Sequence, residues 1–104
     1  MKGRNTMNIK KTQNGNKLTV ALEGRLDTVS SPELEADLKN SLDGITDLVF
    51  DISELEYISS AGLRVLLSTQ KIMNKQGEMS ITGANEAIME IFDVTGFVDI
   101  LNIK

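Results

Sequence analysis

The segment from residue 48 to residue 67 joins an apolar run to a serine pair and a leucine-rich stretch with helical spacing. The run, residues 48–52, has the near-continuous apolar pattern typical of a strand covered on both faces. After Ser59 and Ser60, apolar residues recur at helical spacing, which predicts a helix that begins at the serines. A buried strand followed by a helix is the repeating unit of α/β folds, so this segment is predicted to form the centre of the sheet.

The rest of the chain is predicted to form strands and helices bounded by glycines or by helix-start residues. The predicted strands are residues 7–11, 18–23 (ending at Gly24), 48–52 and 79–82, and the first two form a hairpin interrupted by Asn14-Gly15. The first predicted helix has Ser31 as its cap and Pro32 as its first residue, and the others begin at the serine pair and after Gly83. Residues 97–104 are a last strand or an apolar tail docked on the sheet. The predicted fold class is α/β, a mixed β-sheet covered by α-helices in the order β-β-α-β-α-β-α-β. One domain is predicted to span residues 1–104, with residues 1–6 as an extension.

The helix after the serine pair is predicted to be mostly buried. Leu63 lies on its apolar side, and Val65 and Ile72 widen the apolar arc. Arg64 begins a polar stripe that continues at intervals of three and four residues, and Gly77 is the predicted stop. A polar stripe of this kind is either a solvated face or a surface that contacts another protein.

The composition excludes several kinds of chemistry. The chain has no Cys and no His, which removes disulfides, thiolate nucleophiles, the usual zinc sites and Ser-His pairs. We therefore predict a protein that is not an enzyme, with no catalytic residues, metal or cofactor. A net charge of −4 argues against direct binding to nucleic acid or anionic membranes, and no segment has the ~20 apolar residues of a membrane span. The predicted location is the cytoplasm.

Ser59 and Ser60 each have two readings. At a helix start, a serine hydroxyl can accept a hydrogen bond from a free backbone N–H and so cap the helix. The same hydroxyl could be phosphorylated, because the helix dipole favours a dianion at that end. The pair also follows the carboxyl end of the predicted central strand, the edge at which α/β sheets form their sites.

Two motifs, GRLD at residues 24–27 and DIS…YISSAGL at residues 51–63, resemble the STAS domain of bacterial anti-sigma factor antagonists when taken with the order of elements. The resemblance covers nearly the whole chain. It implies a partner switch, in which the unmodified protein binds an anti-sigma factor that is also a serine kinase and so frees a sigma factor. Phosphorylation then ends the binding, and a serine phosphatase reverses it.

The resemblance also implies site residues. The family's phosphorylated serine falls on Ser60, and Ser59 takes the place of the usual Asp, which makes Ser59 the second candidate. The residues implied at the partner contact are Asp27, Ser59, Ser60, Gly62, Leu63 and Arg64. The predicted contact surface combines the Asp27 loop, a loop at residues 54–59 and the exposed side of the following helix.

Other readings stay open at this point. Asp27 could be an ordinary exposed acid near a helix start, and Asp51 with Ser53 is expected to order the loop by side-chain to backbone hydrogen bonds. Tyr57 and Ile58 are expected to anchor that loop by apolar contacts. An alternative function is a STAS accessory subunit of a membrane transporter or a signalling scaffold, in which the serine only caps the helix. The family often closes with one more helix, so a homodimer that covers exposed sheet is a further option.

Overall fold

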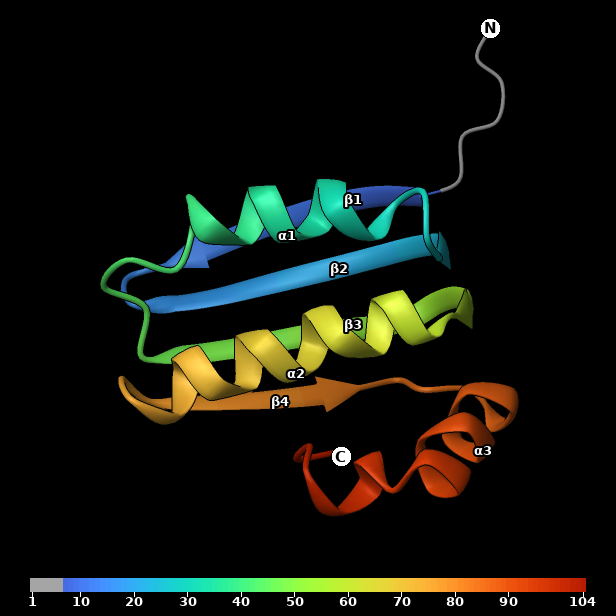
Figure 1. Ribbon diagram of the computed structural model, residues 1–104. Helices are drawn as coiled ribbons and strands as arrows, with labels where there is room; N and C mark the ends of the chain where they lie inside the picture. The colour runs from blue at the N-terminus through green and yellow to red at the C-terminus, as the bar shows by residue number, and fades with distance from the viewer. Residues whose placement is uncertain (1–6) are drawn as a thin grey trace, which may run out of the picture.

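The computed structural model describes residues 7–104, so the predicted extension at residues 1–6 lies outside the described residues. Its sheet has the spatial order β1-β2-β3-β4. The strands are β1 Met7–Asn14, β2 Lys17–Leu26, β3 Asp47–Ile58 and β4 Glu78–Thr82. β1 is antiparallel to β2, whereas β2, β3 and β4 are mutually parallel, which confirms the predicted mixed sheet. The carboxyl ends of β2 and β3 therefore meet at one edge (Figure 1).

The helices also follow the predicted order. They are α1 Ser31–Lys39, α2 Ser60–Asn74 and α3 Glu86–Thr95, followed by a short 3-10 helix, η1 Phe97–Asp99. In Figure 1, α1 and α2 lie side by side on one face of the sheet, and α3 with the C-terminal segment lies beside β4. None of the helices within residues 7–104 is long and apolar enough to cross a membrane.

Alternating apolar residues of the strands and one side of each helix form the core. Phe50 of β3 and Phe92 of α3 are its largest fully buried side chains, and Leu34 of α1 is also fully buried. Ile72 is an exception to the predicted apolar arc of α2, because its side chain is 41% exposed. The predicted arc is therefore too wide at Ile72, whereas Val65 is 6% exposed and belongs to the core.

Both central strands are longer than predicted. β2 continues through Gly24 to Leu26, and β3 continues past Ile52 to Ile58. The pairing of the two strands shifts register at two places, and Gly24 has a φ of +100° next to the second shift. Such bulges change the burial period, so buried side chains of β3 after Ile52 are three residues apart rather than two. The predicted loop at residues 54–59 is therefore mostly strand.

The predicted last strand is absent from the C-terminal segment as described. Gly96 ends α3 with a φ of +81°, and the chain then forms η1. Only Ile103 pairs with the sheet, in a parallel bridge to Ile81. The N–H of Ile81 donates to the carbonyl of Asn102 at 2.9 Å, and the N–H of Lys104 donates to the carbonyl of Ile81 at 2.8 Å. The docked apolar tail, the second of the two readings, is the one confirmed.

Candidate functional site

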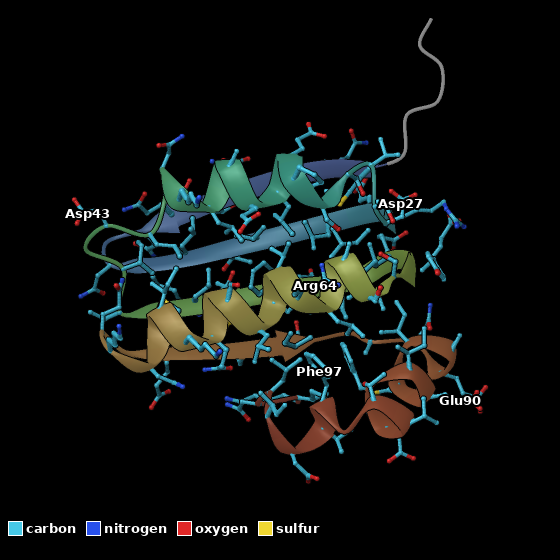
Figure 2. The ribbon with its side chains drawn as sticks, viewed as in Figure 1. Asp27, Asp43, Arg64, Glu90 and Phe97 are labelled. Atoms are coloured by element: carbon cyan, nitrogen blue, oxygen red, sulfur yellow. The ribbon has the colours of Figure 1, made fainter. Side chains whose placement is uncertain are left out.

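The carboxyl ends of β2 and β3 bring the two sequence motifs together. Leu26 and Ile58, the last residues of the two strands, are partners in the sheet. The next residue after β3 continues the contact, since the backbone N–H of Ser59 donates to the carbonyl of Leu26 at 2.9 Å. The turn that begins at Asp27, which Figure 2 labels, lies at the edge where parallel strands place their sites. The hydrogen bond from Ser59 to Leu26 places this turn next to the serine pair.

Ser59 is the N-cap of α2. Its backbone is extended, with φ −97° and ψ 176°, and its Oγ accepts a hydrogen bond from the N–H of Gly62 at 3.3 Å. The side chain is half-buried. Ser59 therefore already has the structural role that either serine could have filled on sequence grounds.

Ser60 is the first residue of α2, and its side chain is exposed. Its hydroxyl makes no hydrogen bond to any other group of residues 7–104. The first N–H groups of a helix have no acceptor within the helix, so a negative charge at this position is favourable. Of the two serines, Ser60 has the hydroxyl that another protein can reach.

Gly62 and Leu63 hold the start of α2 against the sheet. A Cβ on Gly62 would lie 2.8 Å from Cγ1 of Ile58 and 2.8 Å from Cγ of Leu26, so only glycine lets the helix approach the strand ends this closely. Leu63 is 6% exposed and belongs to the core. Both residues position the helix, and a direct partner contact by either stays a prediction.

Asp27 organises the turn between β2 and α1. Its Oδ1 accepts hydrogen bonds from the backbone N–H groups of Val29 at 3.0 Å and Ser30 at 3.1 Å. The buried Ser30 hydroxyl donates to the carbonyl of Arg25 at 2.7 Å and accepts from the N–H of Asp27 at 2.9 Å. The hydrogen bond from the Ser30 N–H is the largest cause that lowers the pKa of Asp27, and it outweighs partial desolvation.

This network places the N-cap of α1 one residue before the predicted one. Ser30, not Ser31, is the N-cap, and its hydroxyl makes no capping bond to the helix. The carboxylate of Asp27 binds the Ser30 N–H in its place. The sequence prediction missed this because it assigned the cap to the serine directly before Pro32, whereas Pro32 is the second helical residue.

We expect the Asp27 turn to loosen in acid. Because the folded-state pKa lies below the usual 3.8, the carboxylate stabilises the turn fully above about that pH and loses its effect as the pH falls through the lowered value. The amide NMR signals of Val29 and Ser30, which donate to this carboxylate, should therefore shift only as the pH falls below about 3.8. The variant Asp27→Asn should abolish this shift, and amide positions that stay constant in the native chain would contradict the assignment.

Arg25 and Tyr57 form a second feature of this edge that the sequence did not predict. They are partners across β2 and β3, and the guanidinium carbon of Arg25 lies 4.5 Å from the centroid of the Tyr57 ring. Nε of Arg25 also lies 3.7 Å from Oδ2 of Asp27. The expected apolar anchoring holds for Ile58, which is 2% exposed and belongs to the core. Tyr57 is 37% exposed, and its ring stacks against a cation at the surface instead.

Asp51 and Ser53 have the expected structural role. Oδ1 of Asp51 accepts from the backbone N–H of Ser53 at 3.0 Å and from the Ser53 hydroxyl at 2.8 Å. These bonds fold the strand locally at the bulge of β3. They leave the carboxylate of Asp51 engaged away from the serine pair.

Arg64 lies one helical turn after Ser60 and is exposed (Figure 2). It lines a groove of about 260 Å³ between α1 and α2, together with Ser31, Glu35 and Ser68. The guanidinium makes no hydrogen bond or ion pair to any group of residues 7–104. No three acidic side chains within the same residues gather closely enough to hold a metal ion.

The chain is similar to known proteins in both sequence and fold. Residues 8–104 match the STAS domain family. The anti-sigma-B factor antagonist of Bacillus subtilis (strain 168) is 32% identical over 99 residues, which are 94% of this chain and 91% of that protein. The crystal structure of an anti-sigma factor antagonist from Mycobacterium paratuberculosis superposes with a TM-score of 0.85 at 22% identity, covering 94% of this chain and 85% of that one. The phosphorylated form of SpoIIAA from Bacillus has a TM-score of 0.74 at 13% identity, covering 93% and 91%.

Proposed function

The chain belongs to the STAS domain family, and from this premise we propose that it is an anti-sigma factor antagonist controlled by phosphorylation of Ser60. It is a binding protein and not an enzyme. In its unmodified form it binds an anti-sigma factor that is also a serine kinase, and the sigma factor held by that protein is released. Phosphorylation of Ser60 ends the binding, and a serine phosphatase restores it.

The observation that carries the proposal is the division of roles between the two serines. The Ser59 hydroxyl caps α2, whereas the Ser60 hydroxyl is exposed and makes no hydrogen bond within residues 7–104. Phosphorylation of Ser60 therefore breaks no bond of the fold. Two facts add support: a relative at 32% identity is named an anti-sigma-B factor antagonist, and a protein of the same fold, SpoIIAA, has a phosphorylated form.

The chemistry is supplied by the kinase. Oγ of Ser60 forms a bond to the γ-phosphorus of ATP, the bond from that phosphorus to the bridging oxygen of ADP breaks, and the hydroxyl proton passes to a base of the kinase. The product carries about −1.5 to −2 extra charges at neutral pH. Burying this dianion in an interface without a basic partner is unfavourable, so the modified surface is rejected.

The proposed contact surface is the edge formed by the Asp27 turn, the Arg25-Tyr57 pair, Ser60 and Arg64. It contains an exposed ring and charges of both signs, a composition suited to a reversible protein contact. This role places the protein in the cytoplasm, where the sigma factor acts. Neither nucleic acid nor membrane is a proposed partner, and a homodimer stays a prediction.

The test is transfer of radioactive phosphate from ATP by the cognate anti-sigma factor kinase. The native protein should be labelled, and Ser60→Ala should not be. Ser59→Ala is the matched control: loss of the cap should cost about 1 kcal/mol in the free energy of unfolding, but the acceptor remains and labelling should persist. Equal labelling of Ser60→Ala and the native protein would overturn the site, and absence of labelling in both would overturn phosphorylation control.

A further inference from the structure

Arg64 is a cation of the proposed contact surface that forms no ion pair within residues 7–104. It is exposed, and its guanidinium pairs with no group of the described part of the chain. Arg25, at the same edge, stacks on Tyr57 at 4.5 Å and lies 3.7 Å from the carboxylate of Asp27. The positive charge of Arg25 is thus already used within the fold, and that of Arg64 is not.

Arg64 and Ser60 are neighbours on the surface of α2. Residues four apart on a helix have Cβ atoms about 6 Å from each other, and helical side chains lean toward the N-terminus. A guanidinium at position 64 can therefore reach a group carried by Ser60, whose hydroxyl is exposed. A phosphate on Ser60 would bring three acceptor oxygens toward the planar guanidinium, which can bind two of them at once.

Arg64 also lines the groove between α1 and α2. Glu35 lines this groove without forming an ion pair to Arg64. Ser31 lines it as well, and its Oγ is buried and has no hydrogen-bond partner within residues 7–104. The groove therefore contains one free cation, one free carboxylate and an unused hydroxyl, and its charge balance depends on where the Arg64 side chain is held.

We propose that Arg64 is the internal receptor of the phosphoryl group on Ser60, and that this pairing withdraws the guanidinium from the groove it lines with Glu35. The inference rests on the proposed role of Ser60 as the phosphoacceptor. Phosphorylation then acts on two neighbouring places: it adds a dianion at the start of α2, and it leaves Glu35 as the unbalanced charge of the groove. A partner that presents an acidic side chain to Arg64 loses that contact.

The test uses the full chain with phosphoserine introduced at position 60 during translation, so no kinase is needed. A ³¹P NMR titration measures the second pKa of the phosphate, which is about 6 for an unpaired group. The native chain should titrate lower, and Arg64→Ala should raise the pKa by about 0.5, the shift expected for loss of one close cation near the surface. Added salt at about 1 M should reduce the difference, because this pair is exposed to solvent.

Two further variants serve as controls. Arg64→Lys should keep part of the lowered pKa, since it retains the charge but not the two-pronged geometry. Lys71→Ala removes an exposed cation of the same helix that lies about three turns from Ser60, and it should leave the phosphate pKa unchanged. Thermal unfolding of the unphosphorylated variants should match the native chain, because Arg64 makes no bond within the described fold.

The outcomes separate this inference from the proposed function. Identical titration curves for the native and Arg64→Ala phosphoproteins would overturn the inference, even if the kinase labels Ser60. A raised pKa in Arg64→Ala would support the pairing of Arg64 with the phosphate, whereas failure of the kinase to label Ser60 would overturn the proposed function. A shift of equal size in Lys71→Ala would also overturn it, because the effect would then reflect net charge rather than a pair.

Discussion

The variant Ser60→Asp should bind the cognate anti-sigma factor at least ~30-fold more weakly than the native protein, a loss of about 2 kcal/mol or more. The side chain at this position is exposed at the centre of the proposed contact, and its hydroxyl holds no bond of the fold. A carboxylate there introduces a charge that the interface must desolvate. Titration calorimetry with the purified kinase in the presence of ADP measures the change directly.

Two matched variants make this result specific. Ser59→Asp adds the same charge one residue earlier, where aspartate caps a helix as well as serine does and where the resemblance places an Asp, so binding should persist. Ser60→Ala removes the acceptor without adding charge and should bind like the native chain. If Ser60→Asp bound within about threefold of the native Kd, a difference under about 0.7 kcal/mol, control by charge at this position would be refuted.

Gly77→Ala should lower the free energy of unfolding by about 3 kcal/mol or more, a large share of the ~5–15 kcal/mol typical of a domain. A Cβ at this position would lie 2.0 Å from the carbonyl oxygen of Thr46 and 2.6 Å from its carbon. That carbonyl cannot move aside freely, because it accepts the N–H of Glu78 at 2.9 Å at the start of β4. Urea unfolding followed by circular dichroism gives the change in free energy.

Gly44→Ala is the control for this prediction. Gly44 has a φ of +80°, so alanine there is strained by roughly 1 kcal/mol, but no atom lies within 4 Å of the added Cβ. The two variants therefore separate backbone strain from a backbone collision. A loss in Gly77→Ala no greater than that in Gly44→Ala would show that the turn before β4 can open without cost.

Much of the fold could be predicted because the periodic patterns are clear where the elements are regular. The β1-β2 hairpin, the central strand and the starts of α2 and α3 follow from alternation, helical spacing and cap residues. The end of β3 could not be predicted in this way, because the bulges place Ile52, Leu55 and Ile58 three residues apart and hide the strand period of two. The sequence left the C-terminal segment open between a strand and a docked tail, because only Ile103 of its apolar residues pairs with the sheet.

The candidate site was predictable in its location and less so in its detail. Parallel strands place their carboxyl ends together, so the neighbourhood of Asp27 and the serine pair followed from the order of elements and from the family resemblance. The roles of Ser59 and Ser60 depend on which backbone N–H each hydroxyl reaches, which sequence spacing does not determine. The stacking of Arg25 on Tyr57 depends on cross-strand register, which the bulges of β2 and β3 alter.

The C-terminal segment has a consequence for self-association through the edges of the sheet. An unpaired edge strand is a template for adding strands of other molecules, which leads to aggregates or extended sheets. At β4 the outward N–H and C=O of Ile81 are already paired with Asn102 and Lys104. The strand at the opposite edge of the sheet, β1, carries Lys10 and Lys11, and lysines on an edge strand disfavour its pairing with a strand of another molecule. A second chain that added a strand at β4 would therefore have to displace the C-terminal segment from Ile81.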